Sequence, residues 1–143
     1  MGQKNEIEVT LREVVNDLDT IFTTAKFFRL MPQLRETEEG DYHERQYRTA
    51  MDGLHPIRDA LDGYAQKAVK KGQYKKLLTC VKELLYCQWM LDWTMQNYED
   101  VRLLAEKNPR ASIAVTWGRV NAKLSYDLTK LPIEEMLETI HCS

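Results

Sequence analysis

The stretch YKKLLTCVKELLYCQWMLDWTMQNYEDV, residues 74–101, decides the class of fold. Its apolar side chains recur every three or four residues, which is the period of one face of an α-helix. This pattern predicts a long helix over roughly residues 73–107. Trp89, Met90 and Trp93 extend the apolar surface around that helix. We therefore expect the helix to be central in the fold, to bind a partner, or both.

The helical period continues on the N-terminal side. A stripe from Leu11 to Phe28 predicts a first helix, with Thr10 and Glu13 as a capping box and Pro32 as its end. A second helix is predicted from Asp41, with Glu44 completing its capping box, to a glycine cap at Gly72. Because Pro56 lies within this second stripe, we expect a kink or a break there.

Two further helices follow on the C-terminal side. One carries Ile113, Trp117, Val120, Leu124 and Leu128 on a single face, and Pro132 suits the first turn of a short last helix. The sequence thus predicts one all-α domain over residues 1–143. It is a bundle of four main helices plus a short C-terminal helix.

Composition narrows the classes of function. The 143 residues are 43% hydrophobic and 29% charged, as in an ordinary folded domain. Lys plus Arg number 20 against 22 Asp plus Glu, so no general basic field favours nucleic acid. No apolar run is long enough to span a membrane. The three cysteines lack metal-ligand spacing, so we expect free thiols, a cytoplasmic location, and neither metal nor cofactor.

Signals for catalysis are weak, because the chain has no phosphate-binding glycine loop. Six residues separate Arg48 from His55, and this spacing is similar to that of the helical ribonucleases of the HEPN group. In that group the histidine transfers a proton and the arginine stabilises phosphate charge. Such pairs also arise by chance, so we expect a histidine at the surface or filling the kink at Pro56, and no enzyme. A HEPN-like ribonuclease remains an alternative.

Charged and aromatic clusters suggest binding. A basic corner formed by Lys67, Lys70, Lys71, Lys75 and Lys76 would suit a helical scaffold or nucleic-acid adaptor, or is simply a solvated turn. The acidic and aromatic side chains are candidates for a partner-binding surface, with a solvated face and core filling as the respective alternatives. They are Glu36, Glu38, Glu39, Asp41, Trp89, Trp93 and Tyr98.

The pair Trp117–Gly118 is unusual inside a helix, where glycine costs about 1 kcal/mol relative to alanine. Glycine lets another backbone or a bulky ring come close. We therefore predict that Trp117, Gly118 and Val120 form a tight helix-packing or dimer contact.

A resemblance is spread over roughly residues 10–128. Its segments are Thr24–Phe28, Leu54-His55, Tyr74, Leu84-Leu85, Asp92-Trp93, Tyr98, Val101, Leu103–Ala105, Val115–Gly118, Arg119-Val120 and Leu124. In order and spacing they resemble the all-helical phage anti-CRISPR proteins that inhibit the type I-F CRISPR helicase–nuclease. This chain departs from the family by having one residue fewer between Gly118 and Arg119-Val120, and by being less acidic.

The resemblance implies a homodimeric, non-enzymatic inhibitor in the cytoplasm of an infected bacterium. Such a protein would bind the helicase–nuclease, occlude its DNA path and prevent its recruitment. The departures leave open whether the target is this enzyme or another CRISPR effector.

Overall fold

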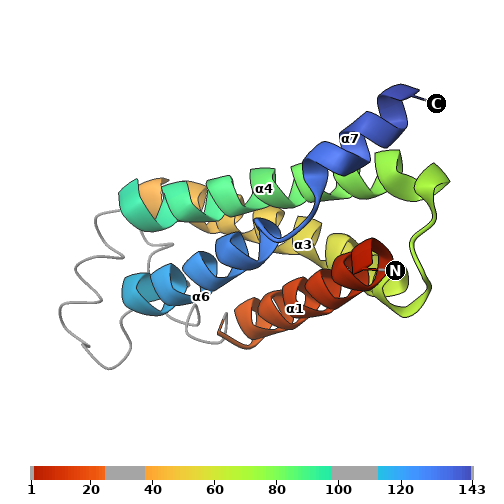
Figure 1. The fold of residues 1–143 in the computed structure, drawn as a ribbon. Coiled ribbons are helices and arrows are strands. Elements are labelled where there is room, and N and C mark those ends of the chain that lie inside the picture. Colours follow the sequence, from red (N-terminus) through yellow and green to blue (C-terminus); the bar gives the residue numbers. More distant parts are fainter. Residues whose placement is uncertain (1, 25–37, 98–112, 143) are drawn as a thin grey trace.

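The computed structural model describes residues 2–24, 38–97 and 113–142 of the chain. These residues form helices and no strand, so the prediction of an all-α bundle is confirmed. In chain order the elements are α1 (Gly2–Thr24), α3 (Glu38–Gln66), the 3₁₀-helix η2 (Lys71–Gln73), α4 (Tyr74–Asn97), α6 (Ile113–Leu128) and α7 (Ile133–Cys142) (Figure 1).

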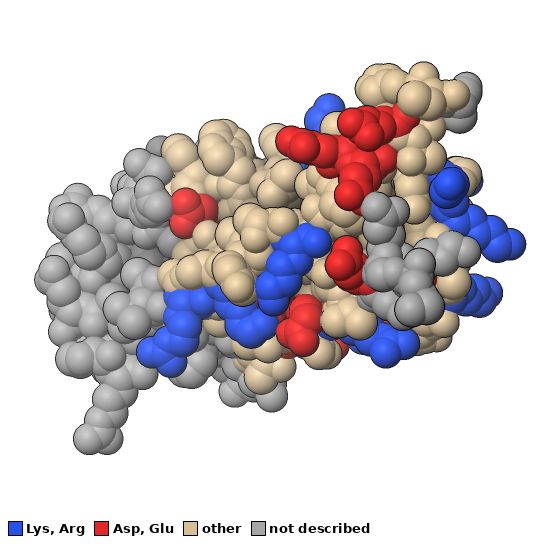
Figure 2. Space-filling model, in the orientation of Figure 1, with Lys and Arg blue, Asp and Glu red and all other residues tan. Residues whose placement is uncertain are grey.

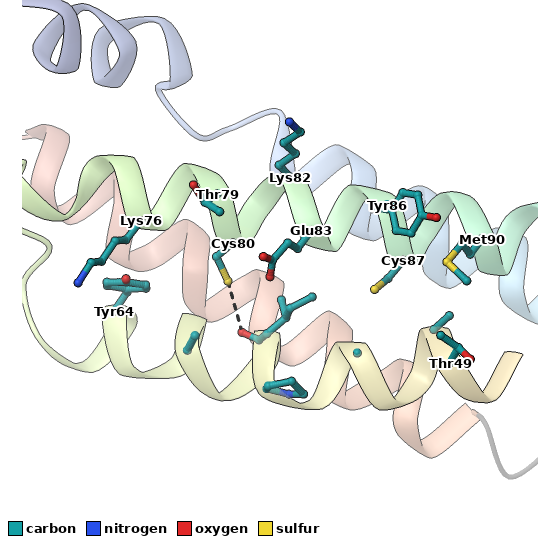
Figure 3. Close-up of a pocket in the computed structure, with 15 residues that line it drawn as sticks. Thr49, Tyr64, Lys76, Thr79, Cys80, Lys82, Glu83, Tyr86, Cys87 and Met90 are labelled. Carbon is teal, nitrogen blue, oxygen red and sulfur yellow. Dashed lines mark hydrogen bonds between the residues drawn. The ribbon is translucent and has the colours of Figure 1, made fainter. Parts of the chain in front are cut away.

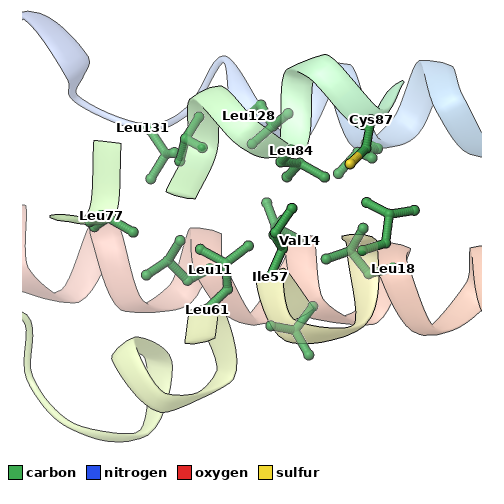
Figure 4. Close-up of a cluster of buried hydrophobic side chains, with 14 of the residues drawn as sticks. Leu11, Val14, Leu18, Ile57, Leu61, Leu77, Leu84, Cys87, Leu128 and Leu131 are labelled. Carbon is green, nitrogen blue, oxygen red and sulfur yellow. The ribbon is translucent and has the colours of Figure 1, made fainter. Parts of the chain in front are cut away.

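One hydrophobic core joins these helices. α3 packs against α4, α1 packs against α3 and α6, and α7 lies across the start of α4 (Figure 1). Leucines from α1, α3, α4 and α6 point toward one another in the centre (Figure 4). Each fully buried leucine contributes about 1.5–3 kcal/mol, so the periodic stripes supply the stabilisation of the bundle. The side chains with essentially no exposure include Leu11, Leu18, Leu54, Leu61, Leu77, Leu84, Leu91 and Leu124.

The predicted beginnings of the first two helices are wrong. α1 begins at Gly2, so Thr10 is a buried residue inside the helix and not its cap. Ile7 is also buried in the core, and its packing continues the apolar stripe toward the N-terminus. α3 begins at Glu38, three residues before Asp41. In α1 the local capping pattern was weaker than the periodicity of the longer helix.

The predicted break at Pro56 is absent, because α3 continues through it to Gln66. Leu54, Ile57 and Leu61 are buried on either side of the proline, and this packing holds the helix across it. The predicted cap at Gly72 is also wrong, since Gly72 lies in η2.

The connection between α3 and η2 is anchored to α1. Val69 is buried, and its backbone N–H donates a hydrogen bond of 2.9 Å to Glu8 Oε1. Without a helical partner this N–H would otherwise be unsatisfied. Glu8 therefore fixes the position of the connection that precedes α4.

The C-terminal predictions are confirmed within the described residues. α6 carries the predicted stripe, and Pro132 directly precedes α7, where the N–H of Met136 donates to the carbonyl of Pro132 over 3.0 Å. α4 is described as far as Asn97, so the predicted continuation to residue 107 lies outside the described residues.

Candidate partner-binding surface

The outward side of α4 carries large apolar side chains in contact with solvent. Leu85, Tyr86, Trp89 and Trp93 keep 49%, 62%, 62% and 38% of their surface exposed. The rings of Tyr86 and Trp89 stack with their centroids 6.2 Å apart. These four residues, three aromatic side chains and Leu85, form what we call the aromatic strip. Exposed apolar side chains that are contiguous in this way mark interaction sites more often than isolated ones do.

A groove of about 880 Å³ lies beside the aromatic strip, between α3 and α4. Tyr86 belongs to both features, so the groove and the strip form one continuous surface. Cys80 and Cys87 point from α4 toward α3, whereas Lys82 points away from it (Figure 3). The side chains that line the groove are Thr49, Ala50, Gly53, Pro56, Ile57, Ala60, Tyr64, Lys76, Thr79, Cys80, Lys82, Glu83, Tyr86, Cys87 and Met90.

Small residues on α3 create this groove. Gly53 suits a close approach of α4, because a Cβ there would lie 3.2 Å from Cys87 Sγ, tighter than an ordinary van der Waals contact. Ala60 is exposed and leaves space that a larger side chain would fill. The groove was not among the features predicted from the sequence. Its signal was the run of small residues among the groove-facing positions of the helix, since Ala50, Gly53 and Ala60 are spaced by three and seven residues.

The thiols of the groove are not activated as nucleophiles. Burial, with a smaller contribution from Glu83, raises the pKa of Cys80 to about 11, and the same causes raise the pKa of Cys87. Cys80 also donates a long hydrogen bond of 3.9 Å to the carbonyl of Ile57. Because the thiolate is the reactive form, both groups act as small apolar side chains at neutral pH.

The basic corner lies at one end of the same two helices. Lys67, Lys70, Lys71, Lys75 and Lys76 are all exposed around η2. Figure 2 shows Lys and Arg side chains at the right-hand edge of the molecule, where the connection between α3 and α4 runs. Lys76 is shared with the groove, so the groove has a positively charged end.

The predicted partner-binding residues are only partly described. Trp89 and Trp93 are both exposed on the aromatic strip, while Glu36 and Tyr98 lie outside the described residues. Glu38, Glu39 and Asp41 lie in the first turns of α3, but their side chains are outside the described part of the chain. Partner binding by this acidic group therefore stays a prediction.

The three residues of the predicted packing contact, Trp117, Gly118 and Val120, differ in how deeply they are buried. Trp117 is 4% exposed and belongs to the core, and Val120 is half-buried against it. Gly118 is exposed, and a Cβ added there would meet no described atom within 4 Å. Among the described residues nothing approaches Gly118, so a packing contact of Gly118 within the chain stays a prediction. A contact with a second copy stays a prediction.

The candidate catalytic histidine is used in packing. The ring of His55 stacks on that of Phe22, with the centroids 4.1 Å apart and the planes 7° from parallel. This contact joins α3 to α1 at the surface. His55 is also exposed, as expected for a surface residue.

A second unpredicted feature is a cluster of charges where α1 meets α6. Lys123 Nζ donates to Asp127 Oδ2 over 2.7 Å and to Asp17 Oδ1 over 3.2 Å, and lies 3.5 Å from Glu13 Oε2. Lys130 Nζ donates to Asp127 Oδ1 over 3.3 Å. The side chains of Asp17 and Asp127 are only 6% and 2% exposed. The sequence held a signal, since both aspartates lie within apolar stripes.

Burial and contact between the carboxyls of Asp17 and Asp127 move their pKa values in opposite directions. Burial, then the hydrogen bond with Asp127, raises the pKa of Asp17 to about 7, against the opposing effect of Lys123. Burial also acts to raise the pKa of Asp127. Hydrogen bonds from Asp17, Lys123 and Lys130 outweigh it and hold that pKa below its ordinary value.

Among the described residues, no group of three or more His, Cys, Asp or Glu side chains is placed to hold a metal ion. No helix in that part of the chain is long and apolar enough to cross a membrane. No family model, curated protein or solved structure matches this chain significantly. The surface geometry and the resemblance in sequence are therefore the observations that bear on function.

Proposed function

We propose that this protein is a non-enzymatic inhibitor that acts by binding another protein, and that its target is a CRISPR effector. The observation that carries the binding proposal is the exposure of Tyr86, Trp89 and Trp93 beside an apolar groove. Tyr and Trp are enriched among the residues that dominate binding energy at protein interfaces. The exposure of 62% of the surface of both Tyr86 and Trp89 has no benefit for folding, so a partner that covers them is the simplest explanation.

The target class comes from the resemblance and not from the surface. The chain resembles phage inhibitors of the type I-F helicase–nuclease in the order and spacing of its motifs. We propose that the aromatic strip and the groove form the contact, and that the bound inhibitor blocks DNA access and recruitment.

The test is co-elution of the purified chain with a type I-F helicase–nuclease on size exclusion, followed by a DNA-cleavage assay on the complex. We expect a stable complex that no longer cleaves DNA. Trp89→Ala combined with Trp93→Ala should abolish both effects. Tyr126→Ala is the matched control, because Tyr126 is also an exposed aromatic residue but lies on α6, outside the strip.

The possible outcomes distinguish an error in the proposed target from an error in the proposed binding surface. If no complex forms with this enzyme, the same assay is repeated with effectors of other CRISPR subtypes. Failure with all of them would contradict the inhibitor proposal. If a complex forms but the double tryptophan variant binds as tightly as the unmodified protein, the inhibitor proposal survives and the assignment of the surface is wrong.

A further inference from the structure

The carboxyls of Asp17 and Asp127 lie together in a buried site between α1 and α6, where Lys123 Nζ donates to both of them, over 3.2 Å and 2.7 Å. Two carboxylates in contact repel each other, and burial strengthens the repulsion because little water screens it. One bound proton removes this repulsion and converts one carboxyl into a hydrogen-bond donor. The geometry therefore favours a state in which the pair carries a single negative charge.

The hydrogen-bond partners indicate which aspartate takes the proton. Asp127 accepts hydrogen bonds from both Lys123 and Lys130, so its charge is well compensated. Asp17 accepts from Lys123 through Oδ1 only, and its buried Oδ2 has no donor among the described residues. A buried carboxylate oxygen without a donor is costly, whereas a protonated Oδ2 can itself donate to Asp127.

We propose that Asp17 and Asp127 share one proton in the folded bundle, and that release of this proton to solvent weakens the contact between α1 and α6. The pair is then a pH-sensitive device within the fold. It is independent of the partner-binding surface, which lies on α3 and α4. Deprotonation leaves two buried carboxylates that share one half-exposed lysine, Lys123. Lys130 contacts Asp127 alone.

The other charged groups around the pair do not cancel the repulsion between the two carboxylates. On α1, Glu13 lies within reach of Lys123 and adds negative charge to the cluster. From α3, Arg58 reaches α1 but pairs with Asp19 at 3.0 Å, and also with Asp59 and Asp62. From α6 and the turn after it come Lys123, Asp127 and Lys130. The described cations that bind the pair are thus the two lysines already assigned to it.

The direction of the pH dependence follows from the pKa of Asp17. Because this pKa is raised from 3.8 to about 7 on folding, the folded state binds more protons than the unfolded state between these values. The stabilisation by this group is complete below about pH 4 and is lost as the pH rises through 7. The lowered pKa of Asp127 acts in the opposite sense and only at lower pH, where its stabilisation is lost as the carboxyl becomes protonated.

The decisive measurement is a carbon NMR titration of the aspartate carboxyls in the unmodified protein. We expect the Asp17 carboxyl to titrate with a midpoint near pH 7 and that of Asp127 to remain ionised down to the acid range. Midpoints below pH 5 for both carboxyls would overturn the shared proton. Because it needs no variant, this measurement is decisive even if substitution of Asp17 prevents folding.

The structural consequence is tested by stability and by amide hydrogen exchange. The free energy of unfolding should fall between pH 5 and pH 8 in the unmodified protein and stay level in Asp17→Asn, which mimics the protonated acid. Asp19→Asn is the control on the same helix and should keep the fall. Because histidines also change charge in this range, the difference between the variants is the readout.

Exchange of the α6 amides, corrected for the intrinsic effect of pH, should report easier opening at pH 8.5 than at pH 5.5. Equal opening at the two pH values, with the proton present in the NMR titration, would refute the weakening of the α1–α6 contact.

Discussion

Trp117 donates its indole N–H to Asp92 Oδ1 over 3.1 Å, and this hydrogen bond joins the first half of α6 to α4. The ring is buried while Asp92 is half-buried at the edge of the core. Trp117 therefore combines a large apolar contact with one directional bond, as buried indoles usually do. The contact orients α6 close to the part of α4 that carries the exposed Trp93.

Trp117→Ala should lower the free energy of unfolding by about 3–5 kcal/mol, because it removes a large core side chain and leaves a cavity. Urea unfolding followed by circular dichroism measures this change. Trp89→Ala is the control, since an exposed side chain should cost less than about 0.5 kcal/mol. A small loss for Trp117→Ala would mean that the ring is not part of the core.

Gly118→Ala should raise the free energy of unfolding by about 0.5–1 kcal/mol. Gly118 lies inside α6 without a positive φ, and an added methyl group would meet no atom of the described residues within 4 Å. Gly53→Ala is the contrasting variant, because its methyl group would press on Cys87 and should give no such gain.

The same variant tests the dimer prediction for Gly118. Light scattering of the unmodified protein and of Gly118→Ala compares their molar masses in solution. If Gly118 is a close contact between two copies, the dimer should be lost in the variant. A dimer that persists unchanged in the variant would contradict that prediction.

Ala60→Trp should leave folding intact and block partner binding. Ala60 is exposed and lines the groove, so an indole at this position occupies the space that a partner would enter. Affinity for the partner is measured by isothermal calorimetry. Ala122→Trp is the matched control, since Ala122 is exposed on α6 away from the groove. Equal affinity of the two variants would exclude the groove from the interface.

Glu8→Ala should cost about 1–3 kcal/mol, because it leaves the backbone N–H of buried Val69 without an acceptor. Glu8→Gln keeps a side-chain oxygen at the same place and should recover most of the loss. Thermal unfolding of the two variants gives the comparison. Similar losses in both would show that the charge of Glu8 is what matters and not the hydrogen bond.

Cys142 should react with a maleimide at pH 7 long before Cys80 and Cys87 do. Cys142 is exposed, whereas burial raises the pKa of the other two thiols and shields them. Mass spectrometry counts the labels with time, and denaturant should release all three thiols together. Rapid labelling of Cys80 in the folded protein would mean that the groove opens readily.

The helical period of the apolar residues predicted the structure better than the capping boxes did. The three- and four-residue period identified the helices that carry the core, because burial of an apolar stripe dominates the stability of a bundle. Capping boxes at Thr10 and Asp41 misplaced the helix starts, since a cap is worth only about 1 kcal/mol. At Thr10, packing of the flanking Ile7 and Leu11 in the core outweighs it. The exposed Trp89 and Trp93 were identified as candidates, but the sequence did not separate surface from core.

The sequence by itself determined the helical class of the fold and the faces that are buried, because periodicity is a property of each helix alone. Only the tertiary structure decided which positions meet across helices. It placed Asp17 against Asp127 and put Trp117, but not Trp89, in the core. It also opened a groove above Gly53. Such relations depend on the orientation and register of one helix on another, and these follow from the packing of all the helices together.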